Sequence, residues 1–129
     1  MKITIKTIPH QEQKYETVGD YWRDLDGSLN IVVSEMSDPT METLVAIHEL
    51  VEVLQMEKHN IPLIASNEFD IIYEKERQVG MHDQDDEPGD DPRCPYRREH
   101  RFAENIERQV AFELGVDWDE YGAKVGAVK

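Results

Sequence analysis

The chain has 129 residues, of which 28 are acidic and 14 are basic, and its formal net charge is −14. This length supports one domain with a single hydrophobic core, and the negative charge would repel nucleic-acid phosphates, so direct nucleic-acid binding is not expected. The single cysteine, Cys94, excludes both an intrachain disulfide and a zinc site built from several cysteines.

The first third of the sequence predicts β structure. Residues 2–8 alternate apolar and polar side chains, which is typical of a half-buried strand and unlike the continuous apolar segment of a signal peptide. A second strand is expected within residues 15–23. The turn signal Asp26-Gly27 then leads into a β-branched segment at 29–34, so the segments on either side of this turn should pair as an antiparallel hairpin.

Three helices are expected after the hairpin. Asp38 or a neighbouring serine caps the first, which covers residues 40–58, and the others cover residues 67–79 and 96–114. Gly115 is a suitable residue to end the last of them. The apolar side of the second helix is expected to consist of Phe69, Ile72, Tyr73 and Val79. The order of elements predicts an α+β fold: a small N-terminal antiparallel sheet followed by about three helices, in a minimal zincin-like arrangement.

Two segments lack the pattern of a regular element. Residues 81–95 contain six acidic residues and three prolines, which predicts an acidic, mobile loop. Residues 117–121 are expected to form a short turn that docks its aromatic side chains. The single domain should therefore span residues 1–122, with a flexible tail at 123–129.

No apolar run approaches the roughly 20 residues that a membrane-spanning helix needs. With a lone cysteine and no signal-peptide pattern, the sequence predicts a soluble, cytoplasmic protein that does not bind membranes. The acidic surface either keeps the protein soluble or imitates a nucleic acid and binds a basic partner.

The helix at 40–58 carries a His-Glu-x-x-Glu pattern. His48 and Glu52 are four residues apart, so both side chains can reach one metal ion from the same face. Glu49 is turned by about 100° from His48 and could act as a general base toward a water beside that ion. Three large apolar residues lie among the polar positions of this helix: Met41, Val45 and Met56. We therefore expect another element to cover part of the polar face; the alternative is an ordinary amphipathic helix with solvated glutamates.

The last helix carries a second pair with the same spacing, His100 and Glu104. If the two helices pack antiparallel, His100 becomes the third metal ligand and Glu104 a fourth ligand or an outer partner. Glu107 lies two turns from His100 and is expected to orient a ligand, and Asp70 could reach the site from the middle helix. The alternative is a helix whose glutamates pair at the surface with its four arginines: Arg97, Arg98, Arg101 and Arg108.

The segment 48–52, the acidic stretch 85–92 with Pro95-Tyr96, His100 and the stretch 115–118 resemble small bacteriophage-encoded proteins of unassigned function. The resemblance covers most of the chain and implies a phage origin and action in the cytoplasm of a bacterial host. The pattern on the first helix is similar to the zincin pattern His-Glu-x-x-His, with Glu52 in place of the second histidine.

Three functions remain open at this point. The first is a metal-dependent hydrolase, in the form of a minimal zincin-like peptidase, with Glu49 as the base. Zinc suits the mixed ligand set, and Mn²⁺ and Fe²⁺ would be tolerated. A related enzymatic variant is phosphate chemistry with Mg²⁺ bound by glutamates of both helices, Glu49, Glu52, Glu104 and Glu107, but the N-terminal strands and the two histidines argue against it. The second is a non-catalytic inhibitor or DNA mimic that binds a host protein through its acidic surface. The third is a metal with a purely structural role.

Overall fold

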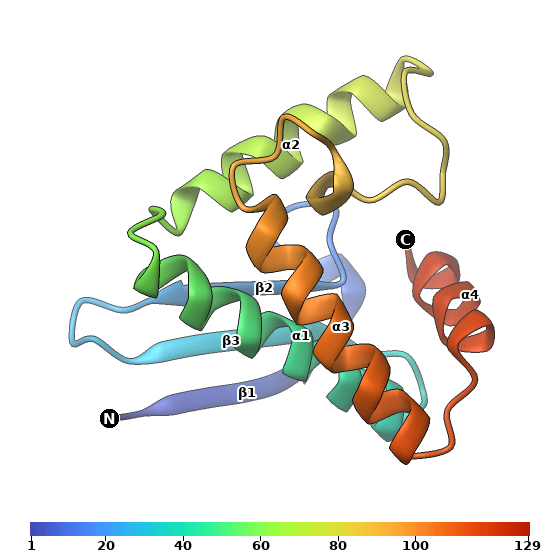
Figure 1. The fold of residues 1–129 in the computed structure, drawn as a ribbon, viewed down its shortest axis with the longest axis horizontal. Coiled ribbons are helices and arrows are strands. Elements are labelled where there is room, and N and C mark those ends of the chain that lie inside the picture. Colours follow the sequence, from blue (N-terminus) through green and yellow to red (C-terminus); the bar gives the residue numbers. More distant parts are fainter.

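The computed structural model describes all 129 residues and confirms the α+β class, with a three-stranded sheet followed by four helices (Figure 1). The elements are β1 (Ile3–Ile8), β2 (Gly19–Arg23), β3 (Leu29–Ser34), α1 (Pro39–Lys58), α2 (Ile64–Gln78), α3 (Arg97–Glu113) and α4 (Trp118–Val128). None of these helices has the length and apolarity needed to cross a bilayer.

The sheet has the strand order β1-β3-β2. The predicted hairpin is present: β2 and β3 are antiparallel, with Tyr21 opposite Ile31. β1 pairs with the other edge of β3 and runs parallel to it, so the sheet is mixed rather than wholly antiparallel. The reason is the connection between β1 and β2, which is long enough to carry the chain past β3 so that β1 and β2 flank it. Both β1 and β2 are therefore edge strands.

Helix α1 begins where its capping residue predicts. The side chain of Asp38 accepts hydrogen bonds from the backbone N–H groups of Thr40 and Met41, at 3.0 and 3.1 Å, which satisfies two amides at the helix start. The helix lies on one face of the sheet, and α3 packs along its outer side (Figure 1). The largest fully buried side chains come from β3 and α1: Leu29, Ile31, Val33, Leu44, Val53 and Met56.

Two predictions about the helices were wrong. On α2, Tyr73 is buried but Ile72 is 52% exposed, and Val79, which follows the helix as its C-cap, is 75% exposed, because α2 packs against little of the rest of the chain. The turn at 117–121 and the flexible tail at 123–129 are instead one helix, α4. Asp117 caps this helix by accepting from the N–H of Glu120 at 2.9 Å, and buried Tyr121 anchors it.

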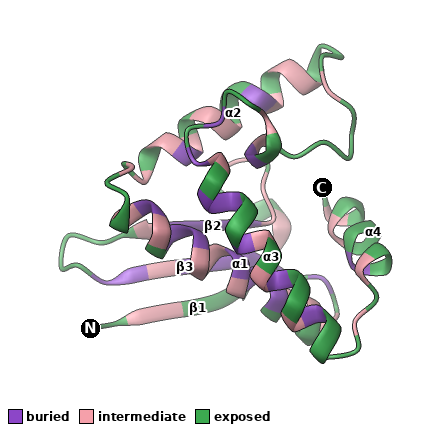
Figure 2. Cartoon of the chain, viewed as in Figure 1, coloured by how far each residue is buried: buried purple, intermediate pink, exposed green.

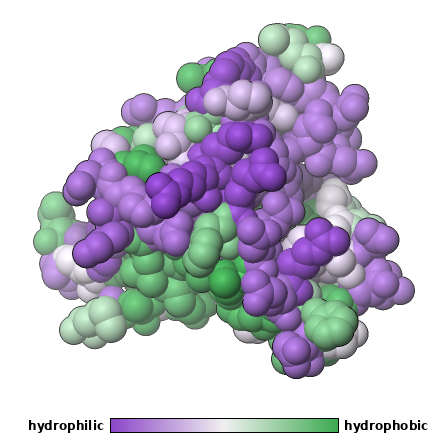
Figure 3. Space-filling view, viewed as in Figure 1, coloured by the Kyte–Doolittle hydropathy of each residue, from purple (hydrophilic) through white to green (hydrophobic).

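The acidic segment between α2 and α3 contains one short 3₁₀ turn, Pro88–Asp90, with Gly89 buried (Figure 2). This turn packs against α3. In the space-filling view, hydrophilic side chains cover most of the face toward α2 and α3, and hydrophobic ones gather below them near the sheet (Figure 3). The acidic segment therefore contributes to the surroundings of α3, where His100 lies.

Candidate metal centre

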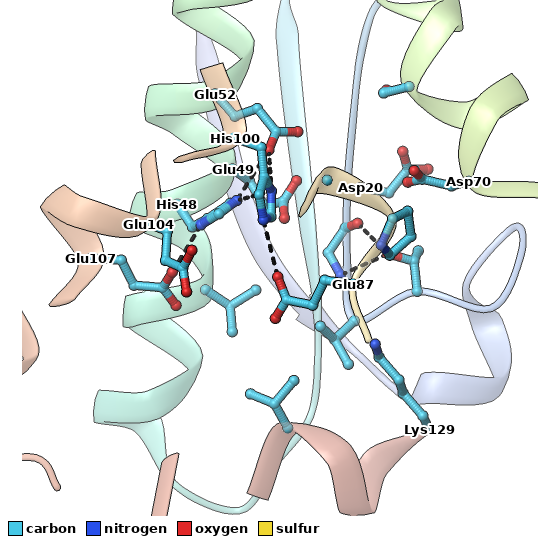
Figure 4. Close-up of a pocket in the computed structure, with 18 of the residues that line it drawn as sticks. Asp20, His48, Glu49, Glu52, Asp70, Glu87, His100, Glu104, Glu107 and Lys129 are labelled. Atoms are coloured by element: carbon cyan, nitrogen blue, oxygen red, sulfur yellow. Dashed lines mark hydrogen bonds and ion pairs between the residues drawn. The ribbon is translucent and has the colours of Figure 1, made fainter. Parts of the chain in front are cut away.

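Helices α1 and α3 bring His48, Glu52 and His100 together inside the molecule (Figure 4). His48 Nε2 lies 3.0 Å from Glu52 Oε2 and 3.2 Å from His100 Nδ1, and His100 Nδ1 lies 3.1 Å from the same Glu52 oxygen. The three residues are only 8%, 5% and 8% exposed. The prediction that another element covers the polar face of the first helix is confirmed, and α3 is that element.

The spacing of these three atoms suits a small cation. In a tetrahedral zinc site with bonds of about 2.0–2.1 Å, the ligand atoms lie roughly 3.3 Å apart. The separations here are only slightly shorter, so His48, Glu52 and His100 could each supply one ligand atom to the same ion. These residues could therefore hold a metal ion.

Each histidine has a carboxylate on its other ring nitrogen. Nδ1 of His48 lies 2.8 Å from Glu107 Oε1, and Nε2 of His100 lies 3.0 Å from Glu87 Oε2. A carboxylate at this position accepts the ring N–H and leaves the opposite nitrogen with a free lone pair, which is how metal-binding histidines are usually oriented. Two lone pairs and a carboxylate oxygen would then face one another, and a cation between them could bind all three.

The outer carboxylates are themselves held in place. Tyr121 of α4 donates a hydrogen bond to Glu107. Tyr21 of β2 donates one to Glu52 Oε1 at 2.7 Å, which leaves Oε2 for the two histidines. The site therefore draws on β2, α1, α3, α4 and the acidic segment.

Without a metal, protons must supply the positive charge. Burial by itself lowers the pKa of His100, but its hydrogen bonds to Glu52 and Glu87 outweigh burial and raise the pKa to about 10. Burial would raise the pKa of Glu52, yet the hydrogen bonds from both histidines lower it to about 2. The pKa of His48 is also raised well above its usual value, because its bonds to Glu107 and Glu52 overcome the effect of burial.

We expect the metal-free protein to lose stability as the pH rises from 6.5 to about 10. The folded-state pKa of His100 is about 10 against an ordinary 6.5, so the stabilisation is complete below the lower value and is lost through this interval. Urea unfolding in the presence of a chelator would measure the loss. The His100→Gln variant should lose much less over the same interval, and equal losses in the two proteins would contradict the assignment.

Glu49 lies beside this trio without a hydrogen-bond partner. Its carboxylate rests against the backbone of Gly19, where an added Cβ would come within 2.6 Å of Oε1. Burial, and next the negative charge of Glu52, raise the pKa of Glu49 well above its usual value. A cation at the trio would favour the ionised carboxylate. Glu49 is thus placed as a group that can accept a proton.

A cavity of about 220 Å³ opens beside the trio and Glu49. Nine of its lining residues carry a carboxylate: Glu16, Asp20, Glu49, Glu52, Asp70, Glu74, Glu87, Glu104 and Glu107. Asp70 accepts a hydrogen bond from Tyr15 at 3.1 Å and another from Tyr96, and burial raises its pKa to about 7. Most of the ionisable groups that line the cavity are therefore acidic.

The predicted site residues fall into two groups. His48, Glu52 and His100 converge, and Glu107 occupies the orienting position expected for it. Glu104 and Asp70 line the same cavity but do not join the converging trio. The side chain of Glu104 makes no hydrogen bond, and the Asp70 carboxylate accepts hydrogen bonds from Tyr15 and Tyr96 instead of contacting the histidines.

Three residues of the site were missed from the sequence: Tyr21, Glu87 and Tyr121. Tyr21 lies within the expected second strand, but nothing in the sequence indicates that its hydroxyl bonds to Glu52. Glu87 is one of six acidic residues in its segment, and nothing in the sequence distinguishes it from the others. Tyr121 was expected to dock its ring, and only the packing of α4 brings its hydroxyl to Glu107.

Gly89 is required by the position of His100. An added Cβ would overlap the His100 ring, so we expect Gly89→Ala to displace this ring and to weaken zinc binding at least tenfold, about as much as loss of an outer partner does. Competition with a chromophoric zinc chelator would measure the change. Gly126→Ala is the matched control, because a Cβ there meets nothing within 4 Å; equal affinity in the two variants would contradict the prediction.

Comparison with protein-family models, curated proteins and solved structures finds no match to this chain.

Proposed function

We propose that the protein is a zinc-dependent hydrolase in which His48, Glu52 and His100 hold the ion and Glu49 acts as the general base. The observation that carries this proposal is the convergence of three buried ligand atoms 3.0–3.2 Å apart, with both histidines oriented by carboxylates. Mn²⁺ and Fe²⁺ would also suit this ligand set, whereas two nitrogen ligands disfavour Mg²⁺.

Each residue of the site has a separate role in the proposed hydrolysis. A bound zinc ion supplies Lewis acidity and makes a neighbouring water easier to deprotonate. Glu49 accepts the proton of that water, Tyr21 fixes the Glu52 carboxylate, and Glu107 and Glu87 keep the two imidazoles in the ligating tautomer. A peptide or another carbonyl compound would enter through the cavity, whose edge includes the acidic residue Glu87.

The alternatives make different predictions. A DNA mimic or inhibitor needs its carboxylates on an exposed face, whereas three acidic residues that line the cavity, Asp20, Glu52 and Glu107, are buried and favour an internal site. A purely structural ion would normally be closed off by four protein ligands. Here three protein ligands converge rather than four, and the nearby Glu49 carboxylate makes no side-chain hydrogen bond; both features favour catalysis. A phage origin and action in the host cytoplasm stay predictions.

Elemental analysis tests the proposal most directly. We expect about one zinc per chain after dialysis of the purified protein, and the same content in His59→Ala, whose histidine is exposed and bonds to Glu99 at 3.2 Å outside the trio. Zinc in far less than stoichiometric amounts, without another divalent transition metal, would refute a metal enzyme of any kind. If the protein contains the metal but Glu49→Gln does not lower the rate of any hydrolysis, the structural role is favoured.

A further inference from the structure

Asp20 of β2 is a buried carboxyl group with one oxygen unused. The residue is 2% exposed and lines the cavity described above. Its Oδ1 accepts a hydrogen bond from the backbone N–H of Tyr21 at 2.8 Å, whereas Oδ2 has no partner. An unsatisfied carboxyl oxygen in the interior costs folding free energy, and a ligand that donates a hydrogen bond to Asp20 Oδ2 would remove that cost.

The strand pairing shows which way this carboxyl group is turned. Ser34 and Asp24 bond across the hairpin to Val18 and Ser28, so the even-numbered residues of β2 direct their backbone groups toward β3. The N–H of Tyr21 therefore points to the free edge of β2. Because Asp20 Oδ1 accepts from that N–H, its carboxyl group has turned to the same free edge. Tyr15 lies near that edge: burial, and then the charges of Asp70 and Asp20, raise the pKa of Tyr15.

No cation of the chain pairs with Asp20. Lys14 is near enough for its charge to lower the pKa of Asp20 slightly against the larger effect of burial, but its ammonium lies over the Trp22 ring, 3.6 Å from the centroid. Apart from the two histidines of the trio, Lys129 is the only basic residue that lines the cavity. Nine of the residues that line the cavity thus carry a carboxyl group, and outside the trio only Lys129 carries a basic one.

We propose that the cavity binds its substrate through a positively charged group, an ammonium or a guanidinium, that pairs with Asp20. This inference deepens the proposed hydrolase function. It rests on that function only where it identifies the positively charged ligand as the substrate. The cavity, at about 220 Å³, is smaller than the roughly 300–1,000 Å³ of sites for drug-sized ligands. It suits a group the size of one side chain, such as the end of a lysine or an arginine.

Probes of equal size and different charge test this proposal. The full chain, with zinc and separately with a chelator, would be titrated with n-butylammonium, n-butanol and n-butyrate and followed by amide shifts in two-dimensional NMR spectra. We expect n-butylammonium alone to shift Gly19 and Tyr21, and Asp20→Asn to weaken its binding at least tenfold. The asparagine keeps an oxygen for the Tyr21 N–H, and Asp119→Asn, at an exposed position on α4, is the matched control and should bind as the wild type does.

Several outcomes would overturn the proposal. The first is that n-butanol binds as tightly as n-butylammonium, and the second is that Asp20→Asn binds n-butylammonium as tightly as the wild type. The third is that the wild type takes up a second equivalent of zinc that Asp20→Asn does not, which would make Asp20 a metal ligand. The comparison of the three probes on the wild type stands even if Asp20→Asn does not fold. Failure of the hydrolase proposal looks different: n-butylammonium would bind at Asp20 while the protein takes up no zinc.

Discussion

Replacing His48 with alanine is expected to weaken zinc binding by more than about 100-fold, because loss of a ligand should exceed the 10- to 100-fold cost of losing an outer partner. His48 supplies one of three ligand atoms and is the residue that links the trio to Glu107. Its removal leaves two ligands, which is too few for a tight zinc site. Competition against a chromophoric chelator at fixed pH would give the two dissociation constants.

The same variant should also lower the stability of the metal-free protein by about 3 kcal/mol, because the buried carboxylates of Glu52 and Glu107 lose a charged partner. Urea unfolding with a chelator measures this part. The matched control is His59→Ala, which removes an exposed histidine with its own glutamate partner, Glu99. If the two variants bound zinc equally well, His48 would not be a ligand.

Replacing Glu49 with glutamine is expected to lower the rate of hydrolysis by about 100- to 10,000-fold, the usual contribution of a positioned general base. The zinc affinity should change little, because Glu49 is not one of the three converging residues. Glutamine keeps the size of the side chain against Gly19 but cannot accept the proton. Turnover of an internally quenched peptide library, half of it with lysine or arginine at each variable position, would measure the rate.

The choice of control matters for Glu49 because the chain is rich in glutamate. Glu113→Gln changes the net charge in the same way at an exposed position on α3, and its activity should match that of the wild type. A Glu49→Gln protein that keeps full activity would rule Glu49 out as the base. A variant that loses zinc together with activity would instead make Glu49 a ligand.

Much of the fold followed from local sequence patterns. The hairpin, the start of α1 and the extents of α1 and α3 depend on alternation, helical periodicity, a turn and a cap, all of which act over a few residues. The helical tail could not be predicted in this way. Gly122 and Gly126 lower its helix propensity, and the helix is stabilised by burial of Tyr121 against the rest of the chain.

The sequence by itself determined half of the candidate site. The i, i+4 spacing placed His48 and Glu52 on one helix face. The same spacing singled out His100 and Glu104 on another helix, of which only His100 joins the trio. Their register was decided by the packing of α1 on α3, because side-chain contacts between residues about 50 positions apart depend on how whole helices pack. Packing of the acidic segment on α3 brought Glu87 to His100, and the fold left Asp20 Oδ2 without a partner. Spacing along one element determined which residues could act together, and only the tertiary structure decided which of them meet.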